Sequence, residues 1–541
     1  MAGSFFGTDG IRGRTSLEDV DENEAIRHIE ERRTLTPAFM RLVGEALSYT
    51  QPDLPGTGNA VVIGWDRRPH NSALVTALTL GLRLTGCRVI HIGECATPTL
   101  HHAVLAFEAR AGCMITASHN PVTDSGIKVF NAYGYKSSRA YEDEVSRTIR
   151  QLAEEDREVD QPDREALKSP DEAHLSWAAT AHQAWLKRRW DDFTACFGPW
   201  SGQAASVVAP NLLVDGANGF ASTWLVDFLK LQGVACSRVA SPSGVLNDGC
   251  GAGDFSPTQT WTYEEAKASS HAMLRRLEPA PPGQLVGAAL DGDGDRCLFI
   301  ESTENGFAIV DGDAMGAMLL NASPDTPWAF AASIESDVGL FAHAKAINPG
   351  TTCIETAVGD RWLSFALRPK DEGWLEGQTM PACCGIEDSG HVVLPSLHPG
   401  TEENWGLVGD GAATLCAVLL ARSNTDGVFE RGWKRRVSIA NSHRARWHRG
   451  SDVFATTLET IQTAMNRLGL ESGQRIIDGE KDLLLVHGTS PDGVASFGVR
   501  NSGTQAKTSL SVRLSQGVEP APFMQMLDEV YASLADELTA S

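Results

Sequence analysis

The chain has 541 residues, of which 42% are hydrophobic and 21% charged, and its 52 glycines and 25 prolines are scattered rather than periodic. This composition is typical of a folded globular protein of several domains, and it excludes a small single module, a disordered chain and a fibrous chain. The 69 acidic residues outnumber the 46 basic residues, which gives a net charge of −23. Such an acidic surface repels nucleic acid and anionic membranes, and we expect neither as a partner. An anionic substrate would therefore need a cleft that is locally basic.

The sequence carries no targeting or membrane signal. The segment 1–14 lacks a basic region followed by an apolar core, and no run approaches the roughly 18 apolar residues of a membrane span. The 11 cysteines stand singly apart from Cys383 and Cys384, without the CxxC pairs of zinc or redox sites. We therefore expect a cytoplasmic protein with reduced, mostly buried thiols.

Short apolar runs alternate with helix-length amphipathic segments, which predicts βαβ units. The pattern begins near residue 61 and recurs until about residue 359. The predicted strands lie at 61–66, 88–93, 112–118, 211–219, 235–239, within 284–300, at 328–334 and at 351–359. Helices are predicted at 73–86 and 221–233. Three α/β domains of similar plan follow from this pattern.

Two stretches depart from the pattern. Between about 135 and 205, an acidic helical region and a Trp-rich helix predict an enlarged connection between domains. After about 436, a helix near 451–468, three strands and a terminal helix predict a small α+β domain. We therefore predict three similar α/β domains with mixed sheets and a smaller C-terminal α+β domain, around a central cleft. The predicted domains are 1–205, 206–305, 306–435 and 436–541.

Ser118 is the first candidate for catalysis. It lies in TASHNP, Thr116 to Pro121, directly after an apolar strand, where a turn presents a hydroxyl at the carboxyl edge of a sheet. Ligands of α/β proteins bind at such edges. A lone Ser-His pair is also common in ordinary turns, so this segment does not identify a site by itself.

The segment Asp291-Gly-Asp-Gly-Asp-Arg296 places three carboxylates at alternate positions, separated by glycines that allow tight turns. Such a set converges hard oxygen ligands on one divalent cation, and Mg²⁺ suits phosphate chemistry. An EF-hand calcium loop is the alternative. Its last position requires Glu, however, and Ser302 stands there after a strand-like run. The pattern therefore favours a catalytic Mg²⁺ site.

Three further segments offer polar groups to a ligand. Arg500-Asn-Ser-Gly-Thr504 lies between two strands and offers a guanidinium, hydroxyls and turn amides to an anion, although a plain hairpin turn is the alternative. Gly7 to Gly13 is a Gly-rich turn that carries Arg12, and it is neither a Walker loop nor a dinucleotide fingerprint. Gly385 to His391 offers groups suited to sugar hydroxyls.

Together these segments resemble the α-D-phosphohexomutase superfamily over the whole chain and in the family's order. TASHNP resembles its phosphoserine loop, DGDGDR its metal loop, GIEDSGH its sugar loop and RNSGT its phosphate loop. Within that superfamily, the strings most similar to phosphoglucosamine mutases are FGTDGIRG at 6–13, LNDGCG at 246–251, VDGD at 310–313 and VGDRW at 358–362. The resemblance implies an isomerase of amino-sugar nucleotide biosynthesis, with a small-molecule sugar phosphate as its substrate, and a homodimer is compatible with it.

The resemblance also implies roles for the matching positions. Ser118 would carry the phosphoryl group and pass it to a sugar hydroxyl, so that glucosamine 6-phosphate and glucosamine 1-phosphate interconvert through a hexose 1,6-bisphosphate, which is both intermediate and activator. The implied catalytic residues are Ser118, Arg12, Lys128 and His119. The implied ligands of one Mg²⁺ are Ser118, Asp291, Asp293 and Asp295. The implied substrate-binding residues are Arg296, Asp360, Arg361, Glu387, Ser389, His391, Arg500, Ser502, Gly503 and Thr504.

The chain departs from the family at several places. Gln505-Ala506-Lys507 replaces the usual Glu-Pro after the phosphate loop, and Ile386 and Asp388 flank the Glu of the sugar loop. Extra length lies near 135–205 and 392–408. Glu387, Asp388 and Asp360 are candidates to attract the ammonium group of glucosamine, which would distinguish it from glucose. The alternatives are a phosphoglucomutase or phosphomannomutase, a phosphoserine-forming hydrolase and, remotely, an inactive homologue that acts as a binding protein.

Overall fold

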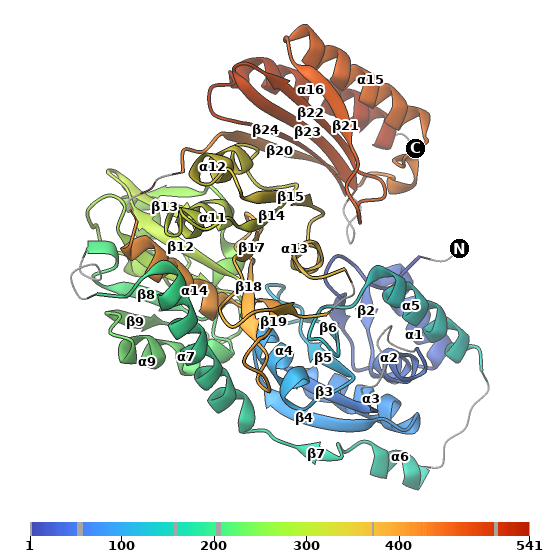
Figure 1. Ribbon diagram of the computed structural model, residues 1–541. Helices are drawn as coiled ribbons and strands as arrows, with labels where there is room; N and C mark the ends of the chain where they lie inside the picture. The colour runs from blue at the N-terminus through green and yellow to red at the C-terminus, as the bar shows by residue number, and fades with distance from the viewer. Residues whose placement is uncertain are drawn as a thin grey trace.

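Four β-sheets follow one another along the chain in the computed structural model, which describes residues 3–50, 58–155, 161–201, 207–370, 373–425, 427, 429–501 and 507–539. Figure 1 shows the first sheet in blue, the second in green and the fourth in red at the top, with the third between them. The first three sheets are mixed and the fourth is antiparallel, which confirms the predicted multi-domain α/β fold class. The domain boundaries stay predictions, although β13 at 306–310 joins the second sheet and β20, from residue 433, joins the fourth.

The first sheet has seven strands in the order β2-β1-β6-β5-β3-β4-β7. Strands β3, β4 and β5 run parallel because helices return the chain between them, and β6 turns back antiparallel to β5. The strands are β1 Ile11–Thr15, β2 Thr34–Leu35, β3 Ala60–Trp65, β4 Arg88–Glu94, β5 Ala111–Ile115, β6 Asp124–Asn131 and β7 Glu172–Ala173. The helices are α1 Glu22–Arg32, α2 Pro37–Tyr49, α3 Asn71–Leu84, α4 Thr97–Ala106, α5 Arg139–Ala153, α6 Gln161–Leu167 and α7 Trp177–Phe197. The turn from β5 to β6 carries Ser118 at the carboxyl edge of the parallel strands.

The second and third sheets share a plan in which parallel pairs continue into an antiparallel hairpin. The second, in the order β10-β13-β12-β11-β8-β9, consists of β8 Leu212–Asp215, β9 Cys236–Val239, β10 Thr260–Thr262, β11 Leu285–Leu290, β12 Cys297–Ser302 and β13 Gly306–Val310, with α9 Leu225–Leu231 and α10 Tyr263–Ala268. The third, in the order β15-β14-β17-β18-β19-β16, consists of β14 Ala329–Ser333, β15 Thr352–Thr356, β16 Leu375–Glu376, β17 Cys383–Ile386, β18 Val392–Leu397 and β19 Asn404–Gly409, with α11 Gly312–Asn321, α12 Leu340–Ile347, α13 Asp360–Leu367 and α14 Gly411–Ser423. The hairpin of the second sheet carries the three aspartates, and that of the third carries the candidate sugar loop.

The fourth sheet is antiparallel throughout, in the order β20-β24-β23-β22-β21. Its strands are β20 Trp433–Ala440, β21 Glu471–Arg475, β22 Leu484–Ser490, β23 Gly493–Asn501 and β24 Lys507–Leu514, with helices α15 Asp452–Arg467 and α16 Pro520–Thr539. Both helices pack against the sheet, and together they bury a hydrophobic core of their own. The predicted α+β unit is therefore present at this end of the chain.

A single hydrophobic core continues across the first three sheets, and helices α7 and α14 lie within it side by side (Figure 1). Helix α14 is apolar on all sides and buried, and Asp410 caps its first turn by accepting from the backbone N–H groups of Ala412 and Ala413. The predicted connection after residue 135 thus forms helices α5, α6 and α7, together with strand β7 on the edge of the first sheet.

The thiols follow the sequence-based expectation. All 11 cysteines are free, and all but Cys196 and Cys353 are buried. Within the described ranges, none of the helices combines the length and apolar character that a membrane crossing requires.

Candidate active site

Ser118 lies on a backbone with φ of 53°, in the left-handed region that side chains rarely adopt. Two side chains hold its carbonyl oxygen: Arg68 donates from Nη2 at 2.7 Å and Asn247 from Nδ2 at 2.8 Å. The hydroxyl Oγ donates to Oδ2 of Asp291 at 2.7 Å. The residue is buried, not at the molecular surface as a strand-end turn suggests, and Asp291 and Asn247 contact it from another part of the chain. The turn therefore aims one hydroxyl at the aspartate loop.

Arg68 is the anchor of the Ser118 loop, and the sequence analysis did not identify it. Its guanidinium donates to four carbonyls of this loop, those of Ser118, Asn120, Pro121 and Asp124. Asp66 accepts from Arg68 Nε at 3.0 Å and fixes that guanidinium. The signal in the sequence was the WDRRP segment directly after a predicted strand, where polar residues reach the same sheet edge as Ser118.

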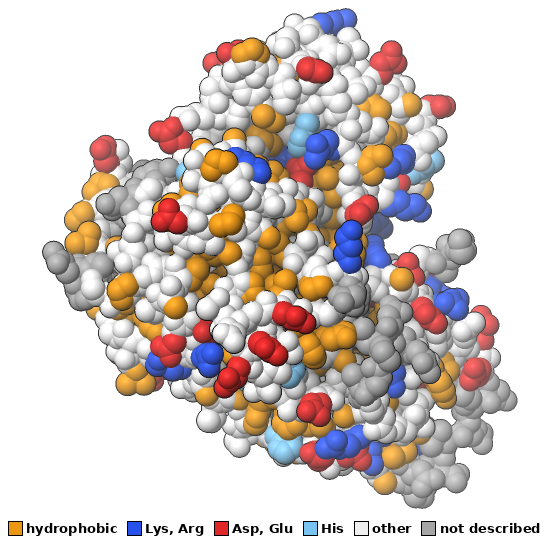
Figure 2. Space-filling model, in the orientation of Figure 1, with side chains coloured by type: hydrophobic (Ala, Val, Ile, Leu, Met, Phe, Trp, Pro, Cys, Tyr) orange, Lys and Arg blue, Asp and Glu red, His pale blue; other side chains and the backbone are white. Residues whose placement is uncertain are grey.

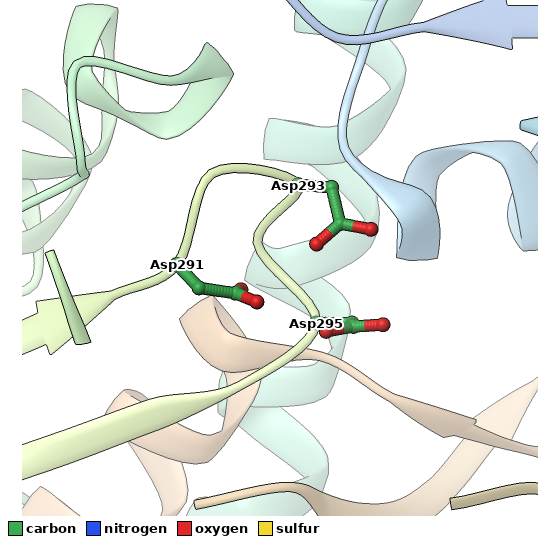
Figure 3. A group of neighbouring side chains, drawn as sticks. All are labelled: Asp291, Asp293 and Asp295. Carbon is green, nitrogen blue, oxygen red and sulfur yellow. The ribbon is translucent and has the colours of Figure 1, made fainter. Parts of the chain in front are cut away.

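The aspartates at 291, 293 and 295 share the single turn that joins β11 to β12 (Figure 3). One carboxylate oxygen from each lies within 4.8 Å of the others, and all three residues are buried. Gly294, with φ of 71°, makes the turn, and its carbonyl accepts from the N–H of Gly411 at 2.9 Å. The turn thus brings three buried carboxyl groups together.

The aspartate set fits a divalent cation. Among the described residues, Oδ1 of Asp291 and Oδ1 of Asp293 are buried without a hydrogen-bond partner, which is unusual for buried carboxylate oxygens. Burial, followed by the charges of Asp293 and Asp295, raises the pKa of Asp291 to about 6. A hard cation among these oxygens would relieve both the missing contacts and the repulsion.

Lys128 lies among carboxylates from two sheets. Its Nζ is 2.7 Å from Oδ2 of Asp293, 2.6 Å from Oδ2 of Asp295 and 2.9 Å from Oδ2 of Asp9. Burial alone would lower the pKa of the lysine, but these three charges raise it well above its usual value. Lys128 is therefore a protonated, buried ammonium beside the aspartate loop.

Arg12 and Lys136 meet at Asp9, the second charged residue that the sequence analysis missed. Arg12 Nη2 is 2.7 Å from Oδ2 of Asp9, and Lys136 Nζ is 2.8 Å from Oδ1. Lys136 also contacts Asp360 Oδ1 at 2.6 Å. Lys136 lies seven residues after the end of TASHNPVTDSGIKV, where no distinct motif marks it, so only the fold could reveal its place in the site.

The candidate sugar loop approaches the aspartate loop through His391. Its Nε2 lies 3.2 Å from Asp295 Oδ1, and its Nδ1 lies 3.2 Å from Glu387 Oε2 and 3.0 Å from Ser389 Oγ. Burial alone would lower the pKa of His391, but the carboxylates of Asp295 and Glu387 raise it to about 10. His391 thus holds Glu387 and Ser389 close to the aspartate loop.

A cleft of about 640 Å³ connects these groups. Of the predicted residues, Arg12, Ser118, His119, Arg296, Asp360, Glu387, Ser389 and His391 line it. Burial, followed by the charges of Arg296 and Arg12, lowers the pKa of His119 to about 3, so its ring is neutral. Arg296 Nε lies 3.1 Å from Asp291 Oδ2. The structure therefore brings eight of the predicted site residues to one cleft.

Arg361 and Arg500 lie outside this cleft. Arg361 contacts Glu142 at 2.8 Å and donates to the carbonyls of Thr8 and Ser137, so its guanidinium joins α13 to the first sheet. Arg500 lines a second pocket of about 130 Å³ on the fourth sheet, and its Nη1 donates to Glu480 at 2.9 Å. Ser502, Gly503 and Thr504 lie outside the described residues.

The pocket at Arg500 contains two cations that the sequence analysis did not identify. Arg436 of β20 and Lys507 of β24 line it with Arg500, and so do the hydroxyl-bearing Ser509 and Ser511. Glu335 forms an ion pair with Arg436 and lines both the pocket and the 640 Å³ cleft. The two cavities thus meet at Glu335.

Comparisons with known proteins agree with this geometry. The family model described as "Phosphoglucomutase/phosphomannomutase, alpha/beta/alpha domain I" matches residues 3–156. The phosphoglucosamine mutase of Rhodococcus erythropolis is 31% identical over 425 residues, which are 77% of this chain and 78% of that protein.

Solved structures show the same fold. A phosphoglucomutase/phosphomannomutase family protein from Burkholderia thailandensis has a TM-score of 0.64 at 17% identity and covers 99% of this chain and 98% of its own. The N-acetylphosphoglucosamine mutase of Aspergillus fumigatus, solved in complex with GlcNAc-6P and magnesium, has a TM-score of 0.53 at 15% identity over 93% of this chain and 99% of its own. The chain therefore belongs to the α-D-phosphohexomutase superfamily, where it is similar to phosphoglucosamine mutases, and it is an isomerase of the phosphosugar mutase type with a metal site at its three aspartates.

Proposed function

We propose that this enzyme interconverts glucosamine 6-phosphate and glucosamine 1-phosphate through a phosphoserine at Ser118 and a 1,6-bisphosphate. The observation that carries the proposal is the 2.7 Å contact between Ser118 Oγ and Asp291, at a loop whose three carboxylates suit one Mg²⁺. The N-acetylphosphoglucosamine mutase of Aspergillus fumigatus was solved with magnesium and a sugar phosphate, which supports the same class of ligands here.

In the proposed reaction, a sugar hydroxyl oxygen attacks the phosphorus on Ser118. A bond from phosphorus to the sugar oxygen forms, the bond from phosphorus to Oγ breaks, and the proton of the sugar hydroxyl ends on Oγ, which leaves Ser118 as a hydroxyl. The bisphosphate then turns over, and its other phosphoryl group returns to Ser118. Catalysis of this kind comes mainly from positioning and charge stabilisation. Mg²⁺ bound by Asp291, Asp293 and Asp295 would neutralise the charge of the phosphoryl oxygens.

The protein's own side chains supply the remaining contacts. The protonated Nζ of Lys128 and the guanidinium of Arg12 stand beside the aspartate loop, where they stabilise negative charge and hold a proton near the reacting oxygen. Glu387 and Ser389 present acceptors to two sugar hydroxyls from the wall of the cleft. Arg500, Arg436 and Lys507 would hold the phosphate that is not reacting.

Two of the three carboxylates expected to attract the ammonium group of glucosamine are already paired with lysines. Asp360 contacts Lys136 at 2.6 Å, and Asp388 contacts Lys434 at 2.7 Å. Their charges are thus compensated within the protein. This observation favours glucose or mannose phosphates as a second candidate substrate class.

The test compares turnover of glucosamine, glucose and mannose 6-phosphates by the purified enzyme with Mg²⁺ and a trace of glucose 1,6-bisphosphate. Intact mass before and after phosphatase treatment, followed by peptide mapping, locates the phosphoryl group. The proposal expects phosphate on Ser118 and a preference for the glucosamine ester. Better turnover of glucose or mannose esters would move the assignment to the second candidate, whereas an unphosphorylated and inactive enzyme would contradict the mutase mechanism.

A further inference from the structure

A group of arginines at the mouth of the main cleft has no part in the reaction described above. Arg14, Arg32 and Arg33 line the same 640 Å³ cleft as Ser118 and Glu387. They come from the edge of the first sheet, where the Arg14 N–H donates to the carbonyl of Arg33 at 2.9 Å and Arg32 ends helix α1. Gly13 permits this approach, because a Cβ there would lie 2.1 Å from the Arg33 carbonyl oxygen.

The charges of these arginines are not compensated within the described part of the chain. Among the residues that the structure describes, no carboxylate lies within ion-pair distance of Arg14, Arg32 or Arg33, and Arg33 donates to the carbonyl of Phe5 at 3.2 Å. By contrast, Arg12, deeper in the cleft, is paired with Asp9. On a chain of net charge −23, three cations without carboxylate partners at the rim of a substrate cleft point to an anionic ligand.

A cation of the C-terminal domain faces this group. Burial, followed by the positive charge of Arg444, lowers the pKa of Arg33. Figure 2 shows Lys and Arg side chains gathered where the C-terminal domain, at the top, faces the N-terminal part of the chain. An anion between the two lobes would relieve this repulsion.

We propose that Arg14, Arg32 and Arg33 form an additional phosphate subsite at the cleft mouth, which retains the sugar bisphosphate while it exchanges its two phosphate groups between Ser118 and the pocket at Arg500. This subsite rests on the proposed function, which requires that the bisphosphate stay near the enzyme while it turns over. The bisphosphate must release its contacts in order to turn over, and each of its phosphates carries a charge of about −1.5 to −2 at pH 7. Cations at the exit favour its rebinding over its escape.

Direct binding tests the inference without relying on turnover. The probe is glucose 1,6-bisphosphate, titrated calorimetrically into Ser118→Ala protein that also carries Arg14→Gln and Arg32→Gln. Arg33 is left in place because it also donates to Phe5. The matched control is Ser118→Ala with Arg27→Gln, which removes an exposed arginine of the same helix that does not line the cleft. We expect the Kd to rise about tenfold in the first protein, as rim charges produce, and to stay unchanged in the control.

Two further titrations, one at high salt and one with a sugar monophosphate, distinguish a phosphate subsite from nonspecific attraction of anions. The increase in Kd should shrink in about 1 M salt, where the screening length is about 3 Å. It should also be smaller for glucose 6-phosphate, which has one phosphate. Equal Kd values in the double variant and the control, or equal increases for both sugars, would overturn the inference. The proposed function fails by a different result, the absence of phosphate on Ser118 in the otherwise unaltered enzyme.

Discussion

Ser118 holds a left-handed backbone that costs a non-glycine residue on the order of 1 kcal/mol or more. The hydrogen bonds from Arg68 and Asn247 to its carbonyl oxygen offset that cost, and they do not involve its hydroxyl. The conformation is therefore independent of Oγ, the atom that we propose to be phosphorylated.

Ser118→Ala should accordingly abolish mutase activity while leaving the fold intact. Only the contact from Oγ to Asp291 is lost, so we expect the thermal unfolding midpoint to change little. Intact mass should lack the phosphoryl increment of about 80 Da that the unaltered enzyme carries. Near-normal turnover by this variant would exclude a covalent intermediate at Ser118.

Asp293→Asn removes one charge from the metal site. The loss of a positioned electrostatic group typically lowers the rate by about two powers of ten or more, and we expect at least that here, together with weaker dependence on Mg²⁺. Asp227→Asn, an exposed change in the same domain, is the control. Activity that survives chelation and does not respond to Mg²⁺ would argue against the site.

Asp313 offers a pH test outside the catalytic loop. Burial, followed by the charge of Asp311, raises the pKa of Asp313 to about 7, and its Oδ1 has no hydrogen-bond partner among the described residues. A carboxyl whose pKa is higher in the folded state than in the unfolded state stabilises the protein at low pH, and this contribution is lost as the pH rises through about 7.

Asp313→Asn should therefore raise the unfolding midpoint at pH 8 more than at pH 5, because the uncharged amide removes the cost of ionising a buried carboxyl. The amide oxygen can still accept from the N–H of Asp337, as Oδ2 of Asp313 does at 2.9 Å. Melting curves at the two pH values measure the effect. An equal shift at both pH values would show that Asp313 is not protonated near neutral pH.

At the scale of elements, helix α7 supports the metal loop through a chain of contacts. Arg189 contacts Oδ2 of Asp410 at 2.8 Å, and both residues are buried. Asp410 caps α14, and the next residue, Gly411, donates from its N–H to the carbonyl of Gly294 in the aspartate turn. The position of that turn thus depends on a helix from the long connection after residue 135.

Arg189→Ala should leave the Asp410 charge buried without its cation and lower the free energy of unfolding by about 3–5 kcal/mol. Arg188→Ala is the matched control. Its side chain is 56% exposed and pairs with Asp192 at 3.3 Å, so we expect a change of at most about 0.5 kcal/mol. Denaturant titration of both variants gives the comparison, and equal losses would show that the buried pair contributes nothing specific.

The predicted site residues that reach the cleft belong to contiguous motifs, because a turn such as DGDGDR places its own side chains together. Lys136 was missed because no motif marks it, and it meets Asp9 only through the fold. Asp9 and Arg68 stand in segments that the sequence does mark, the Gly-rich turn before Arg12 and the end of the strand predicted at 61–66, but their partners cannot be read from the sequence. Likewise β2, β7 and β16 have two residues each, too few for an alternating pattern to indicate a strand.

At the scale of the whole molecule, the sheets were predictable because apolar runs and amphipathic helices alternate over most of the chain. The long connection had no such pattern, and its placement depends on tertiary contacts: Trp185 of α7 donates to Ser396 of β18, and Phe197 stacks on Trp328. The C-terminal α+β unit was predictable in the same way, from its helix, three strands and terminal helix, and it buries a core of its own. Because the C-terminal unit has its own core, we expect it to be able to move as one body relative to the rest.

The two cavities meet at Glu335, so movement of the C-terminal unit would affect catalysis. In the structure Glu335 is paired with Arg436 and lies 3.9 Å from Arg500. A phosphate that enters the smaller pocket competes with Glu335 for both arginines. Binding of the distal phosphate would thus draw the C-terminal domain over the cleft and exclude water from the phosphoserine.

Arg436→Ala should therefore raise KM for the sugar monophosphate, lower kcat and increase hydrolysis of the phosphoenzyme, since the closed state loses one of its contacts. Arg435→Ala provides the control. Its side chain projects from the opposite face of β20, because successive strand residues alternate, and it does not line the pocket. Steady-state kinetics and release of inorganic phosphate from ³²P-labelled enzyme measure the two effects. A rise in KM without added hydrolysis would mean that the pocket binds phosphate but does not control access of water, and kinetics equal to those of Arg435→Ala would remove Arg436 from the site.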